Sequence, residues 1–202
     1  RRKTARMMRK RFMARRRISS VRTFTECLYA GALGTNQGGI FNCRLSDVPQ
    51  VSDYARLYSQ FAIKKLKVVL LPKYGPAEPN AALGGVTSVD LQNVRVAYAI
   101  NTTPDKLVPT SELDVLTDNG SKVIVGHKRI TVSCRPKPDL CMKDAFSNAF
   151  PAVRRRGLTW LNFNNPGTGS NGETIEHDGI AYWISQGNTA IAPFDAFDAY
   201  YY

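Results

Sequence analysis

The sequence predicts an all-β fold in which two sheets pack face to face or one sheet closes into a barrel. About eight segments are rich in β-branched and aromatic residues, and loops rich in Gly, Pro and Asn separate them. No helices alternate with these strands, which disfavours a central parallel sheet. The 202 residues suffice for one such domain with a full core, but not for two.

In the first half of the chain, three strands and one helix are expected. Residues 21–29 (VRTFTECLY) have strand composition, and we expect the glycines and asparagine of 31–39 to end this strand before a short one at 40–45. Tyr54, Leu57, Tyr58 and Phe61 recur at helical spacing, which predicts a short helix over 53–61. The segment 62–71 (AIKKLKVVLL) then forms a strand that Pro72 and a long loop terminate.

The second half contains only strands and loops, apart from a possible helical turn at 111–116. Residues 94–100 alternate cleanly between two faces, which is typical of a half-buried strand. Further strands are expected over these segments: 122–134, 158–163, 175–185 and 194–202. The long loops are 72–92, 101–121 and 164–174.

The positive charge of the chain is concentrated in its first 17 residues. The net charge is +12, and this segment holds ten basic residues and no acidic one: Arg1, Arg2, Lys3, Arg6, Arg9, Lys10, Arg11, Arg15, Arg16 and Arg17. The remainder carries 18 basic and 16 acidic residues, so it is nearly neutral. Self-repulsion and few apolar groups prevent such a segment from folding alone, and a polyanion is its natural partner. We therefore expect residues 1–20 to form a nucleic-acid-binding arm and 21–202 to form the folded domain.

The arm also admits other functions. The same residues would serve as a nuclear localisation signal, which does not compete with nucleic-acid binding. Alternatively, the arm is a solubilising tail, or Met8, Phe12 and Met13 form the apolar side of a helix lying on a membrane. No apolar run is long enough to cross a bilayer, so stable membrane insertion is not expected.

The order of features along the chain resembles the capsid proteins of small circular single-stranded-DNA viruses, the circovirus-like group. An arginine-rich arm leads into strands, and Tyr58 and Phe61 precede a strand with Ile63, Lys65, Lys67 and Val68 that Pro72 closes. The turn Arg135-Pro136-Lys137-Pro138 and the pair Trp160-Leu161 also match this family.

This resemblance implies a viral fold and several partners. It implies one eight-stranded jelly roll, sixty copies of which form an icosahedral shell with the arm inside against single-stranded DNA. The expected location is the virion, and the host cell nucleus during assembly. Expected partners are the genome, other copies of the chain, the nuclear import machinery and a cell-surface receptor.

Residues outside the arm give weaker signals for nucleic-acid binding. Arg154, Arg155 and Arg156 form a second basic cluster, which would contact the genome or a neighbouring subunit, or remain solvated. Lys128, Arg129, Arg135 and Lys137 flank one strand segment and leave the same alternatives. Aromatic residues could stack on bases, but in the strands of a sandwich they are usually core or interface residues.

Catalysis and metal binding are not expected. The two histidines, His127 and His177, are far apart, and no nucleophile motif or phosphate-binding loop is present. The cysteines at 27, 43, 134 and 141 form no C-x-x-C pair and predict free thiols, not a zinc site. No cofactor is therefore expected.

Two alternatives to a DNA-virus coat protein remain at this point. A coat protein of a small single-stranded-RNA or satellite virus also combines a jelly roll with a basic arm. A cellular β-barrel nucleic-acid-binding protein with a basic tail would share the composition, but it would remain a monomer or dimer.

Overall fold

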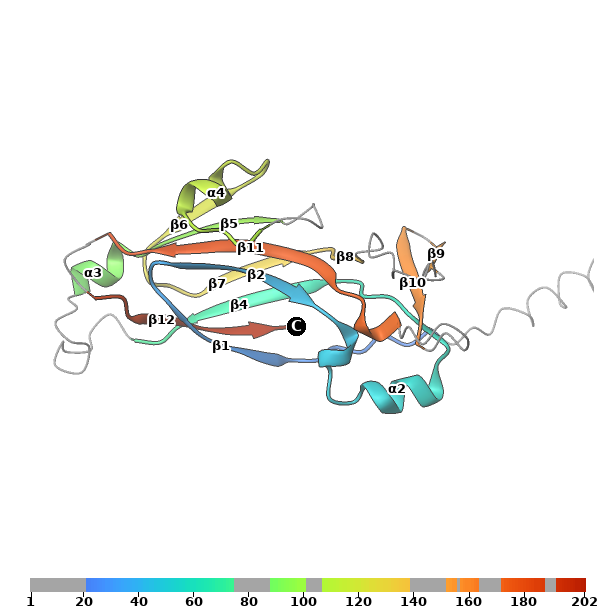
Figure 1. Ribbon diagram of the computed structural model, residues 1–202. Coiled ribbons are helices and arrows are strands. Elements are labelled where there is room, and N and C mark those ends of the chain that lie inside the picture. The colour runs from blue at the N-terminus through green and yellow to red at the C-terminus, as the bar shows by residue number, and fades with distance from the viewer. Residues whose placement is uncertain are drawn as a thin grey trace, which may run out of the picture.

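The fold is described from a computed structural model (Figure 1). The description covers residues 21–74, 88–100, 107–138, 152–155, 157–163, 172–187 and 192–202, and it excludes the side chains of 88–89 and 152–155. The arm, residues 1–20, and Arg156 therefore lie outside the described residues.

Two antiparallel sheets form the body of the molecule (Figure 1). Sheet A has the order β1-β12-β4-β7, and sheet B has the order β2-β11-β5-β6. The strands of sheet A are β1 (Leu28–Gly34), β12 (Asp195–Tyr201), β4 (Leu66–Pro72) and β7 (Ile130–Cys134). Those of sheet B are β2 (Gln37–Cys43), β11 (His177–Ser185), β5 (Arg95–Ile100) and β6 (Lys122–Val125), and a two-residue strand, β8 (Lys137–Pro138), also pairs with β11. The two sheets with this strand order are the eight-stranded jelly roll that the resemblance implies.

A smaller three-stranded sheet lies at one end of the sandwich. Its order is β3-β10-β9, with β3 at Gln60–Phe61, β10 at Leu158–Asn162 and β9 at Ala152–Arg155. The short helices are α2 (Val51–Leu57), α3 (Ser88–Gln92) and α4 (Glu112–Leu116), with 3-10 turns at Leu45–Asp47 and Gly172–Thr174. None of the described helices is long and apolar enough to cross a membrane.

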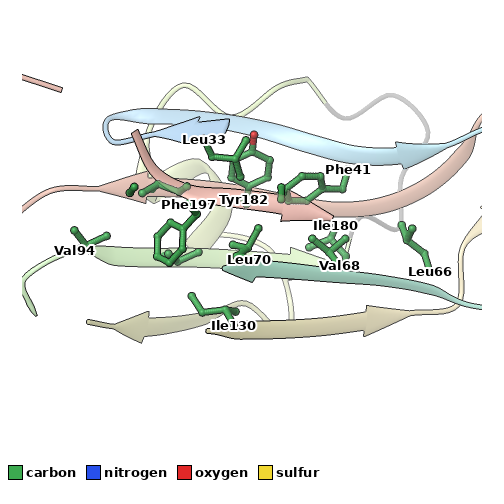
Figure 2. Close-up of a cluster of buried hydrophobic side chains, with 14 of the residues drawn as sticks. Leu33, Phe41, Leu66, Val68, Leu70, Val94, Ile130, Ile180, Tyr182 and Phe197 are labelled. Atoms are coloured by element: carbon green, nitrogen blue, oxygen red, sulfur yellow. The ribbon is translucent and has the colours of Figure 1, made fainter. Parts of the chain in front are cut away.

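The main core lies between the two sheets and draws on all eight of their strands (Figure 2). Phe41 of β2 stacks on Tyr182 of β11 at 4.4 Å between ring centroids, and Tyr201 meets Phe41 edge-on at 5.5 Å. Phe197 of β12 is fully buried among Leu, Ile and Val side chains from both sheets. This burial of apolar surface is the main term that stabilises the sandwich.

Strand β11 is central to sheet B and is buried along most of its length. It pairs with β2 on one side and with β5 on the other. Its register with β2 shifts between His177 and Ile180, and Gly179 lies in this irregular step. A Cβ atom at Gly179 would lie 1.6 Å from the carbonyl oxygen of Phe41, so only glycine allows the two strands to approach this closely.

Several strand boundaries differ from those expected. Residues 21–27 do not form a strand, and β1 instead continues through Gly31 and Gly34, which we expected to be strand breakers. The turn is confined to Thr35-Asn36, where Asn36 adopts φ of 57°. Glycine is required in β2 because Gly39 lies against the Tyr182 ring, where a Cβ would come within 2.7 Å of the hydroxyl oxygen.

The expected single strand at 122–134 is wrong. It divides into β6 and β7, which belong to different sheets. Gly126, with φ of 96°, starts the turn between them.

The helix expected over 53–61 is confirmed as α2, but it ends at Leu57 because Gln60 and Phe61 pair with β10. The expected helical turn is α4, capped by Ser111.

Candidate nucleic-acid interface

Residues 21–26, which directly follow the arm and which we call the root of the arm, pack against helix α2. Phe24 stacks on Tyr54 at 4.6 Å between ring centroids and meets Tyr58 edge-on at 5.9 Å. The Tyr54 hydroxyl donates a hydrogen bond to the carboxylate of Glu26, and this bond raises the pKa of Tyr54. The chain therefore enters the folded domain at a defined position beside α2.

A second apolar cluster connects α2 to the strands that carry the other basic segment. Phe61, Leu161, Phe163 and Ile175 form its buried centre, and Tyr54 and Tyr58 pack against it. Leu161 belongs to β10, which pairs with β9. This cluster thus connects α2, on which Phe24 packs, to strand β10 of the β9–β10 hairpin, and α2 and the hairpin lie at the same end of the molecule (Figure 1).

Strand β9 carries two of the three arginines of the basic cluster predicted from the sequence. Arg154 is paired with Thr159, and Arg155 is paired with Leu158 across the hairpin. Gly157, with φ of 73°, lies in the turn, and the guanidinium of Arg135 lies against it: an added Cβ there would be 3.5 Å from that group. Arg135 therefore lies at the same end of the molecule as the hairpin that carries Arg154 and Arg155.

Exposed lysines border the same region. Lys65 directly precedes Leu66, and Arg135 directly follows Cys134, the residue paired with Leu66 in the β4–β7 ladder. Lys64 and Lys65 are both exposed. Lys137 in β8 is opposite Asp178 in β11. We call this region the basic end. It comprises Lys64, Lys65, Arg135 and Lys137, together with the segment of β9 that carries Arg154 and Arg155.

Acidic residues near the basic end are partly neutralised by other cations. Arg44 forms an ion pair with Glu176 at 2.5 Å, which lowers the pKa of Glu176, and Arg56 lies 4.0 Å from Asp53. Lys64, Lys65, Arg135 and Lys137 form no ion pair with another described residue. All four of these residues are exposed, so an external anion can reach them.

The structure separates cations that the sequence placed together. Lys128 and Arg129 precede β7, whereas Arg135 and Lys137 follow it. A strand of this length spans roughly 17 Å, so the two pairs lie at opposite ends of β7. Only the second pair belongs to the basic end.

Most aromatic candidates are core residues, as their strand positions indicated. Phe163 and Tyr182 are buried, Tyr98 packs against the main core, and Trp183 packs under α4. Tyr202, which directly follows β12, is an exception: it is 41% exposed, and the Lys67 amino group lies 4.8 Å from the centre of its ring.

Tyr29 is an exposed aromatic residue that the sequence analysis did not single out. It lies opposite Tyr200 in the β1–β12 ladder, with 5.2 Å between their ring centroids, and its hydroxyl donates to Asp198. The alternation of side chains between the two faces of β1 would have identified Tyr29 as an outward-facing residue only if the bounds of β1 had been predicted correctly. Tyr29, Tyr200 and Tyr202 form a row on the outer face of sheet A, and Tyr202 lies beside Lys67 near the basic end.

Further titratable groups are buried in the sandwich. Burial lowers the pKa of His177, which is 1% exposed, and its Nδ1 lies 3.0 Å from the Ile175 carbonyl oxygen. Burial also raises the pKa of Cys43 to about 12 and that of Cys134 to about 11. Among the described residues, no group of three or more His, Cys, Asp or Glu side chains could hold a metal ion. Cys141 lies outside the described residues.

Comparison with known proteins assigns the chain to a family. The model of the circovirus capsid protein family matches residues 1–199. A decameric BFDV capsid protein crystal structure is 16% identical, with a TM-score of 0.50 over 89% of this chain and 95% of that chain. A 60-mer BFDV capsid protein structure is also 16% identical, with a TM-score of 0.51 over 91% and 92% of the two chains. No curated protein sequence matches this chain. The family match spans almost the whole sequence, so this jelly roll with its basic arm belongs to the circovirus capsid protein family.

Proposed function

We propose that this chain assembles into a small icosahedral shell and packages single-stranded DNA through residues 1–20, with 21–202 as the shell-forming domain. The observation that supports the proposal most directly is the position of the arm's root. The root packs on α2, and α2 shares its core with the hairpin of Arg154 and Arg155. The arm therefore leaves the domain beside further cations, which extend one continuous anion-binding region.

Family membership and the likeness in fold support the proposed assembly into a closed shell. The related BFDV capsid protein forms a 60-mer. Identical chains ordinarily satisfy their surfaces through closed symmetric assembly. With sixty copies, the arms would contribute on the order of 600 positive charges, enough to neutralise a large share of a small genome's phosphates.

Arginine-rich binding of this kind is strong, independent of base sequence and sensitive to salt. Each cation that neutralises a phosphate releases a condensed counterion, which gives a slope of roughly −0.7 per contact for single strands. Arginine outnumbers lysine eight to two in residues 1–17. The planar guanidinium suits bidentate phosphate contacts and stacking on unpaired bases.

Deletion of residues 1–17 tests the packaging function of the arm. The truncated domain should fold with an unchanged melting temperature, because residues between 33 and 201 supply the core between the two sheets. Nucleic acid should no longer copurify with it, and the protein should no longer accumulate in the nucleus, since the arm is also proposed as the nuclear localisation signal. A truncated protein that still packages nucleic acid would contradict the proposed function of the arm.

A further inference from the structure

The outer side of sheet B carries a cluster of exposed apolar side chains that neither the core nor the basic end uses. Six of the thirteen large apolar residues that are exposed in the described part of the chain fall within residues 107–125. We call this cluster the α4–β6 surface: Leu107, Val108, Leu113, Leu116, Val123 and Val125.

Four of these residues, Leu113, Leu116, Val123 and Val125, lie on one side of the sandwich. Val123 and Val125 lie opposite Ala97 and Arg95 in the β5–β6 ladder, so they occupy the same face as those residues. Ala97 and Ala99 are covered by Val115 of α4, which places α4 on that face as well (Figure 1). Ile124, between the two valines, points the other way and packs against the main core.

Helix α4 holds its exposed leucines in fixed positions. Val115 is fully buried, and Glu112 forms an ion pair with Arg95 at 2.6 Å and accepts a hydrogen bond from the Ser185 hydroxyl at 3.1 Å. Ser111 caps the helix through the backbone N–H of Asp114. Leu113, which is 67% exposed, and Leu116 are thus held in water by a well-anchored helix.

Strand β6 adds an unpaired edge to this surface. It is the last strand of sheet B, and its outer edge pairs with no other strand in the part of the chain that the structure describes. Exposed edges with apolar side chains favour association, and proteins usually cover or charge them. Clustered exposed apolar groups likewise mark interaction surfaces more often than isolated ones do.

Charge identifies the kind of partner. Residues 107–125 contain three carboxylates, Glu112, Asp114 and Asp118, and one lysine, Lys122. Ten of the 28 basic residues lie in residues 1–17 and the rest of the chain is nearly neutral, so this stretch is a mildly acidic part of a nearly neutral domain. It would repel nucleic acid, but its carboxylates are complementary to the exposed cations of the basic end of another copy.

We propose that the α4–β6 surface is an interface between copies of this chain. The proposal rests on the proposed shell assembly and assigns one of its contacts to named residues. Leu113, Leu116, Val123 and Val125 supply the apolar centre of the contact, and the neighbouring carboxylates supply its polar rim. This division into an apolar centre and a polar rim is the usual anatomy of a protein interface.

Photo-crosslinking in assembled particles tests the contact directly. The full chain with Leu113→p-benzoylphenylalanine is assembled and irradiated, and the products are digested and sequenced by mass spectrometry. The expected product is a covalent dimer in which residue 113 is joined to a peptide of a second copy. Intact particles whose position 113 gives only intrachain, nucleic-acid or no crosslinks would overturn the proposal. Failure of the unmodified chain to form particles would instead count against the proposed function.

A matched pair of substitutions tests the energetic importance of the surface. Leu113→Asn should raise the protein concentration needed for assembly at least tenfold, with no change in melting temperature of the unassembled chain. Leu57→Asn is the control, because Leu57 is 74% exposed and also lies on a short helix, and the uncharged asparagine leaves the charge of the basic end as it is. It should change that concentration less than twofold. Equal effects of the two substitutions, or none from Leu113→Asn, would contradict the assignment.

Discussion

At the scale of single residues, close contacts between strands determine where glycine is required. Composition alone marked the glycines of 31–39 as strand breakers, because glycine is depleted in strands. The structure shows that Gly39 instead makes room for the Tyr182 ring, and that Gly179 allows β11 to approach β2. Such requirements depend on residues more than 100 positions away, so no local pattern reveals them.

Gly179→Ala should destabilise the domain strongly. The added methyl group would overlap the carbonyl oxygen of Phe41, so β2 and β11 must separate, at a cost of about 3 kcal/mol or more. Gly34→Ala is the control, since its added Cβ would have no neighbour closer than 3.6 Å and its φ is not positive. Urea unfolding of the unassembled protein measures both. A Gly179→Ala variant as stable as the Gly34→Ala variant would show that the close approach is wrong.

At the scale of elements, the positions of the strands could be predicted from the sequence more reliably than the pairing of one strand with another. The alternation of 94–100 correctly identified β5, and the spacing of Tyr54 and Tyr58 correctly placed a helix. The segment 122–134 was interpreted as one strand, because both of its halves have strand composition and only the short turn at 126–129, which Gly126 starts, separates them. Which strands pair, and which sheet each joins, depends on long-range packing that periodicity does not encode.

The basic end is likewise a product of element packing. Sequence order grouped Arg135 with Lys128, but the direction of β7 carries them apart, and the β4–β7 register brings Arg135 beside Lys65. The Arg154–Arg156 cluster could be found from sequence, whereas the connection of its hairpin to α2 could not. That connection is a small core built from residues of 45–63, 161–163 and 175.

Neutralising the basic end should reduce the salt dependence of binding. In the full-length chain, the double variant Lys65→Gln with Arg135→Gln should lower the slope of log K against log salt for single-stranded DNA by about 1.4, at roughly 0.7 per lost contact. Lys122→Gln with Lys128→Gln is the control: it removes the same charge away from the basic end and should leave the slope nearly unchanged. Fluorescence titrations at several salt concentrations measure the slopes. Identical slopes for the two double variants would show that the basic end makes no phosphate contacts.

At the scale of the whole molecule, different surfaces of one jelly roll have different partners. The core between the sheets makes a rigid unit. At one end the arm's root and the basic end are available to a polyanion, and the acidic, apolar outer side of sheet B is available to another copy of the chain. Family membership establishes a viral capsid protein. The division of its surface between genome and neighbours is our proposal.

The most direct test is to purify the full-length chain and to examine it by negative-stain microscopy together with its absorbance ratio at 260 and 280 nm. We predict uniform shells that carry nucleic acid, and selective nuclease digestion of the extracted contents should identify single-stranded DNA. Shells that contain only RNA would contradict the proposed genome type. Monomers free of nucleic acid at every salt and protein concentration would contradict the packaging account itself.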